Sequence, residues 1–277
     1  MNIDNKFKVC IAIPIYKNTL DKNEKKSLLQ VLNILTNYSI IFFHPSGLVL
    51  SELQKICLTH NNCSFEAFDD KYFVSIGSYN DLLYKKEFYQ RFKHFEFMLL
   101  YQLDAYVFRD ELDLWCKAGF DYIGAPWFKN YDTHEKEEEF ISNAGNGGFS
   151  LRNIQSIILA MSQEFGFIDL IKLQKILKLN RINLPYYVFI KSLFKKMKFA
   201  KCIESFAKNS LPNEDVFFAL IIPKIFPKFK SAEFYQAIPF SFECSPEKLF
   251  KMNGHNLPFG CHGWYKYSKE FWKHFIK

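Results

Sequence analysis

Short apolar runs alternate with longer amphipathic segments through the first hundred residues. The apolar runs lie at 8–16, 39–45, 63–70 and 95–108. They are short and rich in β-branched and aromatic residues, which is typical of strands buried in a sheet. Between them, apolar residues recur at helical spacing over 21–37, 50–60 and 78–92. This βαβαβαβ order predicts a mostly parallel central sheet with helices on both faces.

The ends of these elements indicate where helices begin and where a ligand would bind. Asp21 stands just before the first amphipathic segment and Ser51 near the start of the second, and both residue types cap helix N-termini. In a parallel sheet, ligands bind outside the carboxyl ends of the strands. Those ends fall at 14–16, 44–45, 68–70 and 103–106.

Beyond residue 108 the pattern is irregular. The glycine-rich stretch NAGNGGFS at 143–150 follows an acidic run at 134–140 and precedes an apolar, helix-like run at 151–161. No internal repeat or low-complexity linker divides the chain. We therefore predict a single α/β domain over 1–277, with a regular half at 1–110 and an elaborated half at 111–277.

Composition limits the class of protein. Of the 277 residues, 49% are hydrophobic, which is enough for a substantial core and argues against a disordered chain. The seven cysteines form no CxxC pair, so zinc-ribbon and redox motifs find no support. There is no secretory signal and no run of about 18 apolar residues that would cross a membrane. We expect a cytoplasmic protein with free thiols.

The formal net charge of +7 is unevenly spread. Residues 171–203 contain nine Lys or Arg and no Asp or Glu. Apolar residues interleave with these cations at helical spacing, which is typical either of helices with solvated basic faces or of a surface that docks on anionic lipid or an acidic acceptor. The second interpretation predicts peripheral contact with the inner face of the membrane. Because no recognition motif accompanies the charge, no nucleic-acid partner is expected.

An aspartate follows the fourth apolar run, in YQLDAYVF at 101–108. A carboxylate there is costly unless it is paired, hydrogen-bonded or bound to metal. At a strand end, Asp104 either caps the following turn or holds Mg²⁺ or Mn²⁺ that bridges a diphosphate. No glycine-rich fingerprint follows the first strand, and GxxxxGKS/T is absent. These absences argue against a dinucleotide-binding dehydrogenase and a P-loop NTPase.

Three further motifs carry candidate chemistry, each with a plainer alternative. Glu214 and Asp215 lie in the first turn of a predicted helix, where they complement the helix dipole, supply a general base, or both. His262 lies between glycines in PFGCHGW, either as a packed side chain or as a ligand for metal or phosphate. The amides of Gly147 and Gly148 either cradle phosphate or sugar ahead of a helix, or merely form a tight turn.

Several blocks resemble a bacterial and fungal domain family of unknown function that is grouped with GT-A glycosyltransferases. The resemblance covers roughly 8–265 and is carried by IPIYK, YNDLLYKKEFYQRF, YQLDAYVFRDEL, WCKAGFDYIGAPWF, GNGGFSLR, NEDVFF and PFGCHGW. It implies a GT-A-like fold whose first half binds the nucleotide and whose second half binds the donor sugar and the acceptor. The implied reaction moves a sugar from a nucleotide-sugar donor to an acceptor hydroxyl, with inversion, on a glycan or lipid-linked acceptor in bacterial surface-glycan (lipopolysaccharide or capsule) assembly.

The resemblance also assigns roles by position. Asp104 matches the first aspartate of the metal-binding DxD motif, but Tyr106 stands where the second belongs, which puts dependence on Mn²⁺ or Mg²⁺ in doubt. His262 matches a histidine that completes the metal shell or touches the diphosphate. Asp215 matches the catalytic base, with Glu214 as the alternative. The implied contacts to nucleotide and donor sugar are Pro14, Ile15, Tyr16, Asn146, Gly147, Gly148 and Arg152.

Two competing functions remain open. The departure at Tyr106 is also expected of a sugar-nucleotide-binding or scaffolding protein that has lost catalysis. A nucleotidyltransferase would share a similar sheet, but it would need a glycine-rich basic signature after the first strand. The segment IPIYKNTLDKNEKK lacks those glycines.

Overall fold

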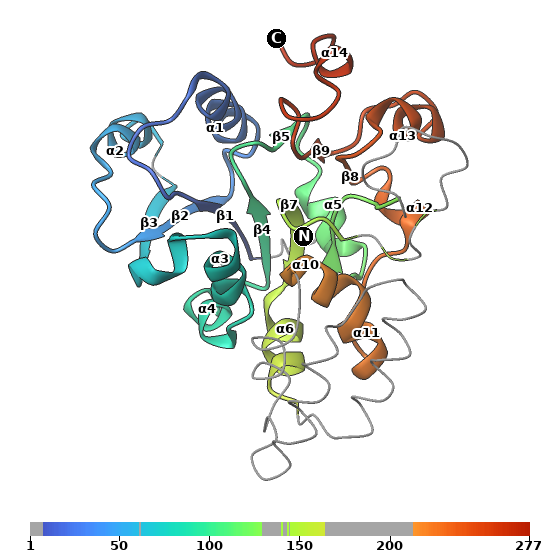
Figure 1. Ribbon diagram of the computed structural model, residues 1–277, viewed down its shortest axis with the longest axis horizontal. Coiled ribbons are helices and arrows are strands. Elements are labelled where there is room, and N and C mark those ends of the chain that lie inside the picture. The colour runs from blue at the N-terminus through green and yellow to red at the C-terminus, as the bar shows by residue number, and fades with distance from the viewer. Residues whose placement is uncertain (1–7, 61, 129–139, 141–142, 144, 164–212) are drawn as a thin grey trace, which may run out of the picture.

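The computed structural model describes residues 8–60, 62–128, 140, 143, 145–163 and 213–277 (Figure 1). Most of the acidic run at 134–140 and all of the basic segment at 171–203 lie outside the described residues. Contact of the basic segment with a membrane therefore stays a prediction from the sequence.

Six strands of the described chain form the central sheet, in the order β3-β2-β1-β4-β7-β6. The first four pair in parallel, whereas β7 runs antiparallel to both β4 and β6. Their bounds are β1 Val9–Pro14, β2 Ser39–Pro45, β3 Cys63–Phe68, β4 Phe97–Tyr101, β6 Tyr122–Ile123 and β7 Phe149–Asn153. The predicted α/β class with a mostly parallel sheet and flanking helices is confirmed.

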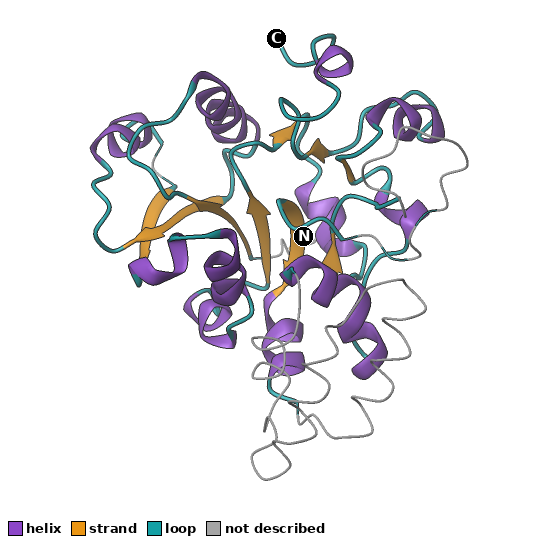
Figure 2. Cartoon of the chain, viewed as in Figure 1, coloured by secondary structure: helices purple, strands orange, loops and turns teal. Residues whose placement is uncertain are grey.

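Helices cover both faces of this sheet (Figure 2). Side chains alternate along each strand, so that Ile11 and Ile13 pack against α1, α2 and α5, while Cys10 and Ala12 face α3, α4 and α6 on the opposite side. Both faces are therefore buried, which explains the continuous apolar runs of the sequence. The helix bounds are α1 Lys22–Ile34, α2 Ser51–Cys57, α3 Ile76–Leu83, α4 Lys86–Arg91, α5 Leu112–Lys117 and α6 Ile154–Met161.

A second, three-stranded sheet lies beside the carboxyl end of β4, in the order β5-β9-β8. Its strands are β5 Tyr106–Val107, β8 Ser241–Phe242 and β9 Gly260–Cys261. It shares a separate apolar core with the C-terminal helices. The remaining elements are η1 Asp70–Phe73, α10 Glu214–Val216, a π-helical turn Phe217–Ile221, α11 Ile222–Ile225, α12 Phe234–Ala237, α13 Pro246–Met252 and α14 Lys269–Trp272. No helix in the described part of the chain combines the length and apolarity needed to cross a membrane.

Several predicted boundaries change in the structure. The predicted helix over 78–92 is two helices, α3 and α4, and the strand over 95–108 ends at Tyr101, after which β5 joins the second sheet. The run at 151–161 begins as strand β7 and becomes helical only at Ile154. The glycine-rich turn therefore leads into a strand, and the prediction of a turn ahead of a helix N-terminus was wrong.

The two predicted caps have different outcomes. Asp21 caps α1 as predicted: its carboxylate accepts N–H groups of Asn23 and Glu24, and the Glu24 side chain accepts the Asp21 N–H in return. Ser51 is already the first helical residue of α2, and Leu50, which precedes it, makes no side-chain capping bond. The predicted Ser51 cap was wrong.

Candidate functional site

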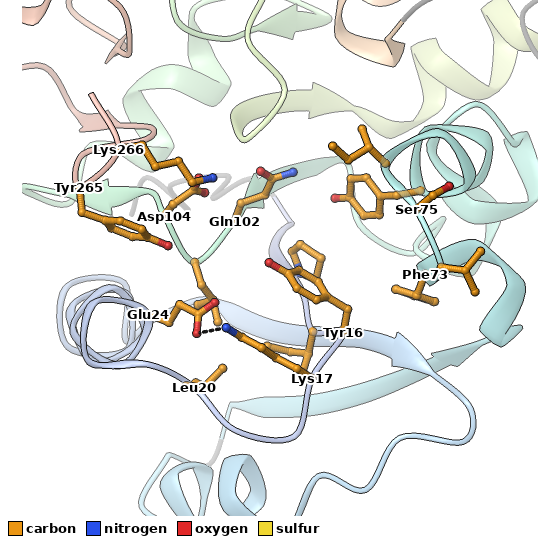
Figure 3. Close-up of a pocket in the computed structure, with 16 residues that line it drawn as sticks. Tyr16, Lys17, Leu20, Glu24, Phe73, Ser75, Gln102, Asp104, Tyr265 and Lys266 are labelled. Atoms are coloured by element: carbon orange, nitrogen blue, oxygen red, sulfur yellow. Dashed lines mark hydrogen bonds and ion pairs between the residues drawn. The ribbon is translucent and has the colours of Figure 1, made fainter. Parts of the chain in front are cut away.

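A cavity of about 480 Å³ opens at the carboxyl ends of β1 and β4, where a parallel sheet is expected to bind its ligand. Four segments far apart in the sequence form its walls (Figure 3). The predicted residues Pro14, Ile15, Tyr16 and Asp104 all line it. The remaining lining residues are Lys17, Leu20, Glu24, Phe73, Val74, Ser75, Ile76, Tyr79, Gln102, Leu103, Tyr265 and Lys266.

Asp104 is buried at the edge of this cavity, and both of its carboxylate oxygens have cationic partners. Oδ1 lies 3.0 Å from Nε2 of His262, and Oδ2 accepts a hydrogen bond from Nζ of Lys266 at 2.6 Å. Burial alone would raise the pKa of Asp104, but His262 and Lys266 outweigh it and hold that pKa well below its usual range. Asp104 is therefore an ionised carboxylate.

His262 lies between two buried carboxylates. Its Nδ1 is 2.8 Å from Oε1 of Glu243, on the side opposite the Asp104 contact, and Gln102 Oε1 is 3.2 Å from Nε2. Burial would lower the pKa of His262, but Asp104 and Glu243 raise it to about 10. The ring is thus an imidazolium near neutral pH, with both nitrogens acting as donors.

The glycine-rich turn is close-packed against this histidine and against the start of α10. A Cβ atom at Gly148 would lie 2.0 Å from Nε2 of His262, and one at Gly147 would lie 2.8 Å from Oε1 of Glu214. Neither glycine has the positive φ that demands glycine. These two positions are glycine because two predicted site residues approach the backbone there.

The polar groups of the turn are bonded within the protein. Asn146 Nδ2 donates to Glu243 Oε1 at 2.7 Å, and its Oδ1 accepts the Gly148 N–H at 2.9 Å. The Gly147 N–H donates to Oδ2 of Asp215 at 3.2 Å. The two amides that the sequence offered for contact with a sugar therefore meet Asn146 and Asp215 in this structure.

Arg152 does not line the cavity, and neither do Asn146, Gly147 and Gly148, the other residues predicted to contact the donor sugar. The Arg152 side chain is fully buried, with Nη2 2.6 Å from Oε1 of Glu214 and the other nitrogens donating to Tyr89 and Ser150. Because β7 runs through the sheet, Arg152 projects into the packed layer and not from a helix start. Its role here is to neutralise Glu214.

Asp215 follows Glu214 in α10 and is only partly buried. Burial, followed by the charge of Glu214, raises the pKa of Asp215 to about 8. Its oxygens accept the N–H groups of Gly147 and Val216, and neither oxygen has an ion-pair partner among the described residues. Of the two adjacent acids, Asp215 is thus the one without a compensating cation among the described residues.

These contacts join most of the predicted residues into one network. It runs from Asp104 to His262, on to Glu243 and Asn146, and through the backbone to Gly147 and Asp215. The sequence reading missed the members Gln102, Glu243 and Lys266. Glu243 follows the short apolar run FSF as Asp104 follows LLYQL, and this shared strand-end signal could have revealed it.

The donor set does not fit a divalent cation. Mg²⁺ and Mn²⁺ take carboxylate oxygens and water, whereas the two Asp104 oxygens contact His262 and Lys266, and both ring nitrogens of His262 contact carboxylates. Among the residues that the structure describes, no three His, Cys, Asp or Glu side chains are gathered as metal ligands. Asp104 and His262 are thus bonded to each other and to Lys266 and Glu243, and are not arranged around a cation in this structure.

Sequence comparison places the chain in a family. The profile of the family described as "Protein of unknown function (DUF5672)" matches residues 62–262, which is most of the chain. The chain belongs to this family. The matched range holds Asp104, Asp215, His262 and the residues that link them, whereas Lys266 lies just beyond it. No curated protein matches the chain.

Solved structures similar to this DUF5672 chain include glycosyltransferases. The apo form of mouse xyloside xylosyltransferase 1 is 13% identical, with 92% of this chain and 97% of that chain covered and a TM-score of 0.49. The galactosyltransferase LgtC, in complex with donor and acceptor sugar analogs, is 13% identical, with 91% and 86% covered and a TM-score of 0.42. The bifunctional glycosyltransferase WbbM in its apo form is 11% identical, with 95% and 46% covered and a TM-score of 0.45. At these scores, the likeness assigns no activity to the chain.

Proposed function

We propose that the chain is a glycosyltransferase of GT-A type that moves a sugar from a nucleotide-sugar donor to an acceptor hydroxyl. The observation that carries the proposal is the continuous polar network between the cavity and α10. One end of it, at Asp104, lies among cations in a cavity at the strand ends. The other end, at Asp215, presents a carboxylate with a raised pKa. Sugar transfer needs these two functions together, because one site must accept a developing anion and another must remove a proton.

The cavity suits the nucleotide. Its volume of about 480 Å³ lies within the usual range for small-molecule sites. Tyr16 is 60% exposed beside Pro14 and Ile15, and its ring offers a flat apolar surface on which a base can stack. Asp104, Lys266 and Gln102 supply polar groups to its lining.

Asp215 is the general base in this mechanism. A base works best when its pKa lies near the operating pH, and burial beside Glu214 brings the pKa of Asp215 to about 8. Glu214 is held by Arg152 and by the Asp215 N–H, so it positions α10 and does not take the proton. A base that activates the acceptor for a single displacement leads to inversion at the sugar carbon.

A nucleotide-sugar panel tests the proposal. Donors should raise the melting temperature, because only the folded state binds them. The donor that does so should release its nucleoside diphosphate when a panel of sugar acceptors is added. Asp215→Asn should keep the shift and lose the release, while Glu87→Gln, an exposed carboxylate on α4, should keep both.

Two outcomes would contradict the proposal in different ways. If no nucleotide-sugar shifts the melting temperature, the cavity is not a donor site. If a donor binds, and wild type and Asp215→Asn both fail to turn it over, the catalytically inactive binding or scaffolding protein is the better account.

We further propose that the acceptor is a glycan or lipid-linked sugar of the bacterial surface, reached at the inner membrane face. Its support is the density of lysine and arginine at 171–203. Flotation with anionic liposomes tests it. Salt-sensitive flotation is expected, and its absence would remove the membrane part of the proposal.

A further inference from the structure

Two lysines on the cavity wall are built alike. Lys17 Nζ lies 2.8 Å from Oε2 of Glu24, and Lys266 Nζ lies 2.6 Å from Oδ2 of Asp104. In each pair the carboxylate side chain is only 6% exposed, whereas the lysine side chains are 40% and 54% exposed. Figure 3 shows both pairs at the cavity, with each lysine reaching toward its carboxylate.

The anchoring carboxylates are themselves fixed. Glu24 accepts the N–H of Asp21 in the capping box of α1, and Asp104 is held by His262. An ammonium group has three N–H donors, so one bond to a carboxylate leaves others for a ligand. Each lysine is thus a positioned cation whose remaining donors are available on the cavity side.

The two pairs act on the same part of the cavity. Lys17, Glu24, Asp104 and Lys266 all line one cavity, together with Tyr16 (Figure 3). The two ion pairs therefore flank one space. Two cations flanking one space match a ligand that carries two linked anionic groups.

Resting on the proposed glycosyltransferase function, we propose that Lys17 and Lys266 bind the diphosphate of the donor and take the place of a divalent cation. A divalent cation would need carboxylate oxygens of Asp104 as ligands, but Lys266 bonds one of these oxygens and His262 contacts the other. Tyr106, in the position of a second aspartate, packs against Phe108 and Trp264 and is not a lining residue of the cavity.

The transfer step then balances without metal. The bond between the sugar carbon and the β-phosphate oxygen breaks, and its electron pair stays on that oxygen. Lys17 and Lys266 stabilise the added negative charge through charge-assisted hydrogen bonds. The acceptor oxygen forms the new bond to the sugar carbon, and its proton passes to Asp215.

Binding of nucleotides with and without metal tests this directly on the wild-type chain. Uridine, guanosine, cytidine and adenosine diphosphates, the matching nucleosides and inorganic pyrophosphate are titrated by calorimetry in EDTA and in Mn²⁺. One diphosphate should bind equally well in both buffers, and more tightly than its nucleoside. Equal binding of pyrophosphate would show that the lysines need no nucleoside. Binding only in Mn²⁺ would overturn the inference while leaving the glycosyltransferase proposal intact, whereas no binding of any nucleotide would overturn both.

Variants identify the cations. Lys266→Met and Lys17→Met should each weaken the diphosphate about 10- to 100-fold, the effect of losing a charge-assisted hydrogen bond, with little change for the nucleoside. Lys266→Arg should keep most of the affinity, because it keeps the charge. Lys251→Met, an exposed lysine on α13, is the matched control and should bind as wild type. Unchanged diphosphate affinity in the Lys17 and Lys266 double variant would overturn the assignment.

Discussion

The cavity wall and the layer behind the glycine turn both use cation–carboxylate pairs, but they differ in how the cation is placed. Lys17 and Lys266 are about half exposed above buried carboxylates, whereas Arg152 is completely buried with Glu214. Arg152 also lies over the rings of Tyr122 and Phe218. The lysines have N–H donors left for a ligand, while Arg152 donates its hydrogen bonds to protein groups.

This difference separates binding from support. An exposed cation stays hydrated when no anionic ligand is bound, and its ion pair adds little to the free energy of unfolding. A buried cation must be fully paired, because a lone buried charge is costly. Of the two adjacent acids of α10, Arg152 neutralises Glu214 and thereby leaves Asp215 as the reactive one.

The largest effect on stability is expected at Arg152. Arg152→Met leaves the Glu214 carboxylate buried without its partner and should lower the free energy of unfolding by about 3–5 kcal/mol. Urea denaturation measures it. Lys273→Met, which breaks the exposed pair with Glu270, is the control and should change the free energy of unfolding far less. Equal losses in the two variants would mean that burial does not distinguish these pairs.

The next largest effect is expected on catalysis, at Asp215. Asp215→Asn should lower the transfer rate about 10²- to 10⁴-fold, the usual contribution of a general base. In the wild type, the rate should rise with pH to a plateau above about 8, because Asp215 must be ionised to accept a proton. A pH–rate profile tests both statements, and an unchanged rising limb in the variant would assign that limb to another group.

The same raised pKa has a consequence for stability, with a defined sign. The folded chain holds the Asp215 proton more tightly than the unfolded chain does. The stability contributed by this group is therefore complete at pH values below its ordinary pKa and is lost as the pH rises through about 8. Asp215→Asn should thus melt higher than wild type at pH 9, while the two should be closer at pH 4.

The regular half of the fold was predictable because its strands are defined by their own residues. The strands around Ile11 and Phe42 are buried on both sheet faces, which requires apolar residues at successive positions. That requirement is visible in the sequence as a continuous apolar run. Strand β7 was missed because LRNIQSIILAM is apolar at helical spacing, and its first residues are strand only through pairing with β4 and β6. Such pairing depends on strands elsewhere in the sequence and cannot be recognised from these residues alone.

The candidate site was predictable where chemistry shows in a short motif. Asp104, Asp215 and His262 were found as a strand-end acid, a helix-start acid and a glycine-flanked histidine. Their partners were not, because both act through tertiary contacts: Lys266 reaches Asp104 from a distant part of the sequence, and Glu243 meets His262 through the pairing of β8 with β9. Arg152 was misplaced for the same reason: its side chain faces the buried layer only because β7 is a strand.

A smaller loss of stability is expected at Gly148. Gly148→Ala puts a Cβ 2.0 Å from the His262 ring, so the ring must move. This displacement should lower the free energy of unfolding by about 1–3 kcal/mol. The variant therefore tests how closely His262 packs against the turn. A loss of activity in it would not by itself show that Gly148 contacts the sugar. Gly77→Ala is the matched control: its nearest contact would be 3.8 Å, and alanine favours helix α3. A Gly148 variant as stable as the Gly77 variant would show that His262 is not held against the turn.

The smallest effects on stability are expected at Lys17 and Lys266, where the effects on diphosphate binding should be large. Lys17→Met and Lys266→Met should each change the free energy of unfolding by under about 1 kcal/mol, because the lysines are about half exposed. Their carboxylates keep other partners, the Asp21 N–H for Glu24 and His262 for Asp104. Urea denaturation beside diphosphate titration separates the two roles. A loss of stability as large as that of Arg152→Met would make the lysine pairs structural, and the distinction between the cavity wall and the buried layer would fail.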